Sequence, residues 1–172
     1  MTSTIRHLLP HPADPIERAE WTSELVYGTL AVLIAIAGID VAGGASATGT
    51  GAIVLVGAAA TWFAHAFSAV LGRRAAMGAH ASAGVGHALL KAWPILLAAI
   101  PSFIAFGGAS LGWWSAGSAM TFSNVAGIVV LGGAGWIAAR AADSNLGGQL
   151  VSTILTASIG LGIVLVEMLV HH

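Results

Sequence analysis

Residues 51–71 read GAIVLVGAAATWFAHAFSAVL, a stretch of 21 residues without a single Asp, Glu, Lys or Arg. As an α-helix with a rise of about 1.5 Å per residue, this stretch is long enough to cross the roughly 30 Å hydrocarbon core of a bilayer. Its apolar residues do not alternate with a period of two, so a strand of a membrane barrel is not indicated. The stretch is followed by the basic pair Arg73 and Arg74. It therefore predicts a transmembrane helix with a charged end.

The composition of the whole chain agrees with this prediction. Of the 172 residues, 57% are hydrophobic and only 8% are charged. With the 23 glycines the apolar share rises to about 70%, against roughly 45–50% in soluble domains. A net charge of −1 gives no electrostatic basis for a nucleic-acid partner. We therefore expect an all-α, polytopic integral membrane helix bundle.

Five apolar stretches have the length of a membrane span. They lie at about 21–41, 51–71, 88–108, 119–139 and 147–170. The third contains Pro94 and Pro101, which neighbouring helices can accommodate within a membrane. Residues 21–172 are thus expected to form one transmembrane domain of five helices.

Residues 1–20 are polar and contain Pro10 and Pro15, so they predict a cytoplasmic leader rather than a cleaved signal peptide. Pro15 is tolerated in the first turn of a helix that continues into the membrane.

The Lys and Arg residues predict the orientation. All of them fall in the leader, in the connection between the second and third spans, or in that between the fourth and fifth: Arg6, Arg18, Arg73, Arg74, Lys91 and Arg140. With five spans these three segments share one side of the membrane. The positive-inside rule makes that side the cytoplasm, so the C-terminus is expected outside, and we expect the plasma membrane of a bacterium.

Ionisable residues within spans are costly and are therefore functional candidates. Asp40 and Glu167 lie within about a turn of the outer ends of their spans, so we expect both to be interfacial. Glu24 lies near the cytoplasmic end of the first span, and His65 lies about 12 Å inward from Arg73 on the second. If these two helices are neighbours, Glu24 and His65 can pair. Such a pair either holds a proton or fixes the helix register through a structural hydrogen bond.

Enzyme signatures are absent from the sequence. It has no HExxH, no GxSxG, no Walker loop and no paired acidic motif. Its seven histidines do not have the spacing of metal ligands, and the absence of cysteine excludes thiolate sites and cysteine nucleophiles. We expect no enzymatic activity, no cofactor and no resident metal.

The first span begins with Arg18-Ala-Glu-Trp-Thr22-Ser23-Glu24. This segment resembles the Arg-x-x-x-Phe-Ser-Asp signature of the transmembrane protein 175 family, potassium-permeable cation channels of endolysosomes and bacteria. The segment Trp62-Phe-Ala-His65 of the second span is similar to a Trp-x-x-His motif in the second helix of that family. The resemblance covers roughly the first hundred residues.

The resemblance implies that the first helix lines the pore of an oligomer and that polar side chains of the first two helices interact. The candidate network is Arg18, Ser23, Glu24, Trp62 and His65. Two residues depart from the family pattern: Thr22 stands in place of the Phe and Glu24 in place of the Asp. The family repeat also has six spans where five are expected here.

Three functions are compatible with these features. The first is an oligomeric K⁺ or H⁺ channel with the first helix near the pore, which implies a lipid bilayer, further copies of the chain and monovalent cations as partners. The second is a non-conducting membrane subunit or scaffold. The third is a small proton-coupled transporter that uses Glu24 and His65 as a proton relay, although no internal repeat is visible.

Overall fold

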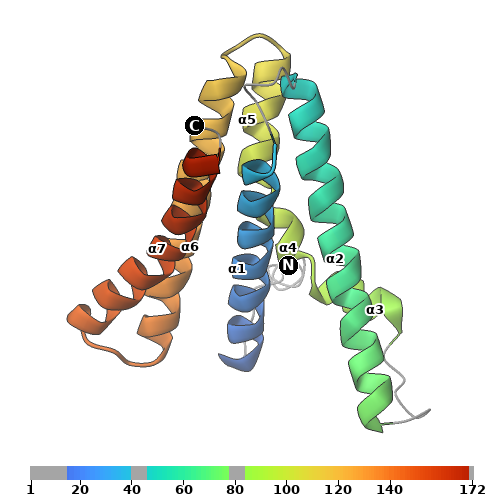
Figure 1. Cartoon of the computed structure of the whole chain (residues 1–172). Coiled ribbons are helices and arrows are strands. Elements are labelled where there is room, and N and C mark those ends of the chain that lie inside the picture. The colour runs from blue at the N-terminus through green and yellow to red at the C-terminus, as the bar shows by residue number, and fades with distance from the viewer. Residues whose placement is uncertain (1–14, 40–45, 78–83, 171–172) are drawn as a thin grey trace, which may run out of the picture.

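A computed structural model describes residues 15–39, 46–77 and 84–170 (Figure 1). Within these ranges the secondary structure is entirely helical, as the composition predicted. The helices are α1 (Pro15–Ala37), α2 (Ala47–Met77), α3 (Val85–Lys91), α4 (Pro94–Leu97), α5 (Ile100–Ser110), α6 (Ala116–Ala141) and α7 (Leu146–Val170).

Four of these helices, α1, α2, α6 and α7, are each long and apolar enough to cross a membrane. Helix α1 begins at Pro15, the residue that the sequence indicated, and ends at Ala37. Helix α2 contains the whole predicted span 51–71 and extends beyond it at both ends. A fifth crossing exists if α3 and α4 together with α5 form one bent span.

The third predicted span, residues 88–108, is not one continuous helix. The chain is broken there into α3, α4 and α5, and the axis bends by 57° between the segment Val85–Leu97 and the segment Ile100–Ser110. Pro94 is the first residue of α4 and Pro101 the second of α5. Because a proline has no backbone N–H and clashes with the preceding turn, each one begins a new helix instead of continuing the old one.

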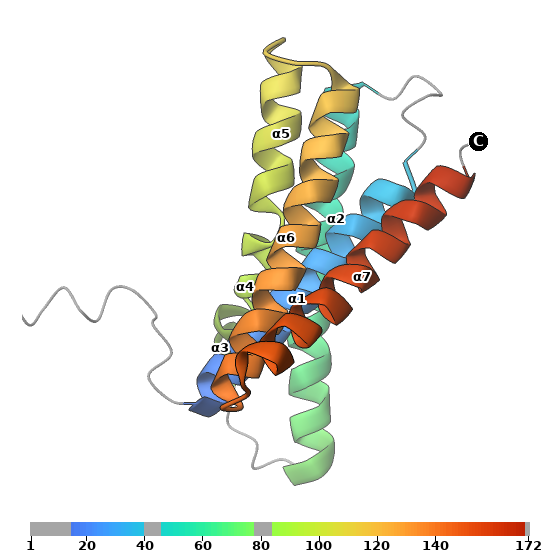
Figure 2. The same ribbon diagram turned by 90° about the vertical axis from the view of Figure 1, so that its left-hand side faces the viewer.

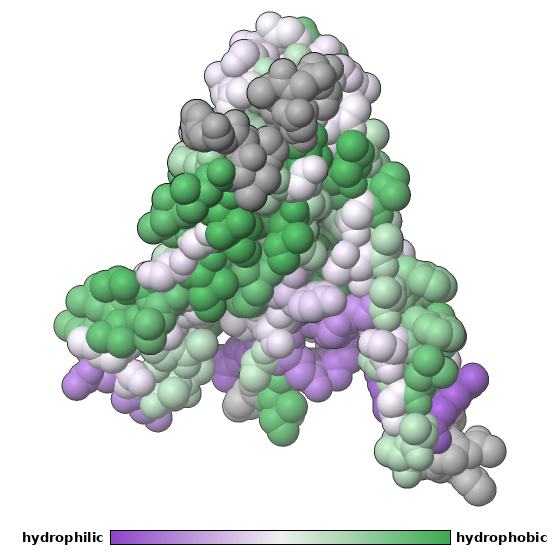
Figure 3. All heavy atoms as spheres, in the orientation of Figure 1, coloured by the Kyte–Doolittle hydropathy of each residue, from purple (hydrophilic) through white to green (hydrophobic). Residues whose placement is uncertain are grey.

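Charged residues gather at one end of the bundle, which we call the cationic end. The described Lys and Arg residues lie in the second turn of α1 or at the ends of α2, α3 and α6: Arg18, Arg73, Arg74, Lys91 and Arg140. These segments lie in the lower part of Figure 1, and hydrophilic residues mark the lower edge of Figure 3. The last turn of α1, the first turn of α2 and the connection from α5 to α6 lie at the opposite end.

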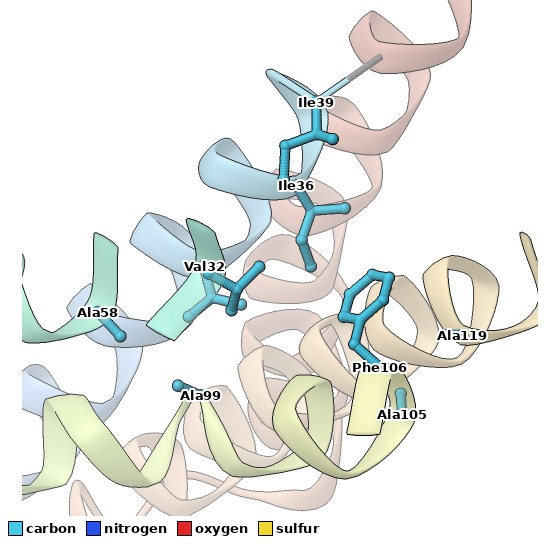
Figure 4. Close-up of a cluster of buried hydrophobic side chains, with 9 residues drawn as sticks. Val32, Ile36, Ile39, Ala58, Ala99, Ala105, Phe106 and Ala119 are labelled. Atoms are coloured by element: carbon cyan, nitrogen blue, oxygen red, sulfur yellow. The ribbon is translucent and has the colours of Figure 1, made fainter. Parts of the chain in front are cut away.

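The largest buried cluster joins α1, α2, α5 and α6 near that opposite end. Ile36, Ile39 and Phe106 are its largest members, with alanines such as Ala119 between them (Figure 4). Many large apolar side chains of α2, α6 and α7 face outward instead. Hydrophobic residues, shown in green, cover much of both flanks of the molecule in Figure 3. Together with the helix lengths, this outward apolar surface identifies an integral membrane protein.

Glycines allow α1 to pack closely against its neighbours. A Cβ atom on Gly28 would lie 2.7 Å from both the Cα and the carbonyl oxygen of Ile95, so α1 touches the backbone of α4. Farther along α1, the buried side chain of Leu33 fills the space beside Gly127 of α6 and contacts the position of Gly160 on α7. Helix α1 is thereby held from several sides within the helix bundle.

We expect Gly28→Ala to lower the free energy of unfolding by about 1–3 kcal/mol, because the added methyl group meets backbone atoms that cannot move aside. The matched control is Gly133→Ala in α6, where a Cβ atom would have no neighbour within 4 Å. That change should be neutral or stabilising by up to about 1 kcal/mol. Unfolding in mixed detergent micelles measures both. Equal effects of the two substitutions would contradict the close contact of α1 with α4.

Candidate functional site

One face of α1 carries the polar contacts of the cationic end. Glu20, Glu24 and Gly28 are spaced four residues apart and so lie on the same side of the helix. Glu20 Oε2 lies 2.5 Å from Lys91 Nζ at the end of α3, and Glu24 Oε1 lies 2.9 Å from His65 Nε2 on α2. Gly28 follows against the backbone of α4. This face therefore joins α1 to three other helices within about two turns.

Glu24 and His65 form the pair that the sequence suggested. The side chain of Glu24 is 17% exposed and that of His65 is 33% exposed. Because an ionised carboxylate only accepts hydrogen bonds, His65 Nε2 donates to Glu24 Oε1 when Glu24 is charged. The ring of Tyr27 lies 5.2 Å from the imidazole and covers one side of it. The pair is thus enclosed by α1 and α2 with limited access for water.

The second carboxylate oxygen of Glu24, Oε2, is buried and has no hydrogen-bond partner among the described residues. The Glu24–His65 pair is neutral when the imidazole is protonated and the carboxylate charged, and equally when the carboxyl group is protonated and the imidazole neutral. A proton can therefore move from one group to the other without changing the net charge of the pair.

Trp62 lies on the same side of α2, one turn before His65, but it is bonded to α3 rather than to α1. Its indole Nε1 donates to the carbonyl oxygen of Leu89 at 2.9 Å. Leu89 belongs to the last turn of α3, where carbonyl groups lack an N–H farther along the helix. Trp62 therefore caps the end of α3 and holds it against α2, beside the Glu24–His65 pair.

Arg18 and Ser23 do not join this arrangement. Both are exposed, and no hydrogen bond or ion pair of the Arg18 guanidinium or the Ser23 hydroxyl is found among the described residues. The Thr22 hydroxyl donates to the carbonyl oxygen of Arg18, at 2.8 Å, within α1. Of the five candidate residues, the structure thus bonds Glu24 to His65 and places Trp62 next to them.

Three residues of this arrangement, Glu20, Lys91 and Tyr27, were not part of the predicted network. Lys91 pairs with Glu20, and Tyr27 packs on His65. The helical spacing of Glu20, Glu24 and Tyr27 on α1 was a usable signal, because residues three and four apart share a face. Within the part of the chain that the structure describes, no group of three or more His, Cys, Asp or Glu side chains is arranged to hold a metal ion.

The expectation that Glu167 is interfacial is wrong. Glu167 is only 9% exposed, and its Oε2 accepts a hydrogen bond of 3.1 Å from Asn124 Nδ2 on α6. Helix α7 turns this residue toward α6 rather than toward headgroups. Asp40, the other residue expected at the interface, lies outside the described residues.

The chain is a polytopic helical membrane protein. Comparison with known protein families, with curated proteins and with solved structures gives no match. The resemblance of the first two helices to the transmembrane protein 175 family remains a prediction based on the motif residues quoted above.

We expect Glu24 and His65 to be energetically coupled. His65→Ala should lower the free energy of unfolding by about 1–3 kcal/mol, because it leaves a buried carboxylate without its donor. Glu24→Gln combined with His65→Ala should cost less than the sum of the single changes. The control is Ser68→Ala, which removes an exposed hydroxyl one turn farther along α2 and should change stability by less than about 0.5 kcal/mol. Additive effects of Glu24→Gln and His65→Ala would contradict the pairing.

Proposed function

We propose that this protein is a subunit of an oligomeric membrane channel that conducts monovalent cations, K⁺ or H⁺, with α1 beside the pore. The observation that carries the proposal is an exposed stripe on the part of α1 that follows its exposed first turns. Helix α1 contacts α2, α4, α6 and α7. Ser23, Tyr27 and Ile34 nevertheless remain exposed, and they are spaced four and seven residues apart. Residues at this spacing lie on one side of a helix.

The stripe changes in character along α1. Toward the cationic end it contains Ser23 and Tyr27, and toward the opposite end it contains Ile34. Repeated around the axis of an oligomer, these side chains would form a polar entrance followed by an apolar constriction. Rings of side chains and constrictions that exclude water are known ways to select and gate ions.

The Glu24–His65 pair supports the same proposal through its position. Glu24 follows Ser23 and precedes Tyr27 by three residues, so it flanks the exposed stripe while its carboxylate is bonded to α2. A charge or proton held there acts on ions that pass along the stripe. The pair also fixes the rotation of α1, which determines the side chains that face the axis. The resemblance to a family of cation channels in these same residues adds to this support.

A proton-coupled transporter is the second candidate, and the broken helix favours it. Discontinuous helices occur at the substrate sites of many secondary transporters, and here the chain bends by 57° between Val85–Leu97 and Ile100–Ser110, close to Gly28 of α1. A channel and a transporter differ in coupling: a channel lets ions flow down their gradient without a second substrate. A scaffold differs from both because it passes no ions.

Disulfide cross-linking tests the place of α1, since the natural chain has no cysteine. Ile34→Cys should form a disulfide between copies in the membrane, because Ile34 is 60% exposed on the stripe. The control is Val129→Cys on α6, where the side chain is 66% exposed on another helix. We expect efficient cross-linking at position 34 and little at position 129. The reverse result would place α1 against lipid and would reject the channel.

Flux measurements on reconstituted liposomes test the conducting function. We expect K⁺ or H⁺ flux through the natural protein and a several-fold loss in Glu24→Gln, which removes the charge of the carboxylate, and in His65→Ala, which removes the bond between α1 and α2. Ser68→Ala should retain the flux. Size-exclusion chromatography verifies that each variant is folded and assembled. Absence of flux from a folded natural oligomer would reject both the channel and the transporter and would leave the scaffold.

A further inference from the structure

A second buried polar pair lies far from Glu24 and His65. Asn124 is on α6, eight residues from its beginning at Ala116 and therefore about 12 Å from the end opposite the cationic end. Glu167 is on α7, three residues before its last residue, Val170. Helix α7 runs obliquely across α6 (Figure 2), and Asn124 Nδ2 donates to Glu167 Oε2 at 3.1 Å.

The carbonyl oxygen of Asn124 is the unusual atom of this pair. Asn124 is only 8% exposed, and its buried Oδ1 has no hydrogen-bond partner among the described residues. A buried acceptor without a donor costs about 1–3 kcal/mol. Unpaired buried groups in native proteins commonly indicate a missing ion, water molecule or proton. The amide N–H of Asn124 already donates to Glu167. Oδ1 therefore lacks a hydrogen-bond donor or a positive charge beside it.

We propose that Asn124 and Glu167 bind one small cation, either a proton or a dehydrated alkali-metal ion, between α6 and α7. A proton on the carboxyl group of Glu167 creates an O–H that can donate to Asn124 Oδ1, so that amide and acid form two reciprocal hydrogen bonds. An alkali-metal ion achieves the same result by binding to the amide oxygen and the carboxylate together, because hard cations prefer oxygen ligands. In both cases one positive charge satisfies the amide oxygen of Asn124 beside a carboxylate that is 9% exposed.

The surroundings of the pair distinguish it from the site at the cationic end. Helix α7 packs against α6 and α1. The other titratable side chains on the described parts of these three helices lie in the half toward the cationic end: Glu17, Arg18, Glu20, Glu24, Tyr27 and Arg140. The proposed cation site therefore does not share groups with the Glu24–His65 pair, and it does not depend on whether the protein is a channel.

The test is the thermal unfolding of the purified full chain in detergent, measured in NaCl, in KCl and in choline chloride at equal ionic strength, and over a range of pH. A cation that binds the folded state raises the midpoint by mass action, by about 2–4 °C or more for a chain of this size once it exceeds its dissociation constant severalfold. We expect such a rise with an alkali-metal ion or with falling pH. Glu167→Gln and Asn124→Leu should abolish it.

Ser123→Ala is the matched control. Ser123 precedes Asn124 and buries a hydroxyl that is also unpaired among the described residues, but it lies about 100° around α6. This variant should keep the full cation dependence. Asn124→Asp provides a second measurement in case Glu167→Gln does not fold. It places two carboxyl groups opposite each other, and the dependence on the cation should increase.

The outcomes distinguish a bound alkali-metal ion from a bound proton. A rise with Na⁺ or K⁺ that Ser123→Ala retains and Glu167→Gln loses identifies an alkali-metal site. A rise only with falling pH, lost in the same variant, identifies a proton. The proposal is overturned if the natural protein responds to neither cation, if Glu167→Gln responds like the natural protein, or if Asn124→Asp shows no greater dependence. Because no ion flux is measured, failure here leaves the proposed channel function unaffected.

Discussion

The hydrocarbon core of a bilayer offers no hydrogen-bond partners, and the structure is organised around that constraint. Every polar group that enters the membrane must find its partner within the protein or remain costly. At the cationic end this requirement joins helices that are far apart in sequence. Glu24 of α1 is bonded to His65 of α2, and Trp62 of α2 is bonded to the end of α3. The apolar contacts between these helices then form around bonds that have little freedom to shift.

The same constraint explains how much of the fold was predictable. Runs of apolar residues are needed to cross a membrane, so the composition indicated the helices and their approximate positions. The pairing of Glu24 with His65 was also accessible, because two ionisable residues at similar depth on successive helices reduce each other's cost. These inferences depend on depth along the membrane normal, which a sequence reveals through the distance of each residue from the charged ends.

Rotation about the helix axis is what the sequence did not reveal. Glu167 was judged only by its distance from the end of α7, although Thr153 and Thr156 lie on the same face of that helix, so its rotation toward Asn124 was missed. The break between α3 and α5 was missed for a related reason. A proline in a membrane helix is compatible with a mild kink or a complete interruption, and the choice depends on neighbours such as Gly28, which lets the backbone at Ile95 approach α1. Arg18 and Ser23 were grouped with the buried residues by motif, whereas their side of α1 is exposed.

The length of α2 has a consequence for how deeply the protein sits in the membrane. With 31 residues, α2 is about 46 Å long, whereas the hydrocarbon core is roughly 30 Å thick. The excess is accommodated by tilt or by projection beyond the bilayer, and Arg73 and Arg74 anchor one end among the headgroups. A thicker bilayer draws more of α2 into lipid and moves the water boundary away from His65, whereas a thinner one moves it closer. Bilayer thickness thus sets how readily water reaches the Glu24–His65 pair, which makes the lipid composition of the host membrane a physical variable of this site.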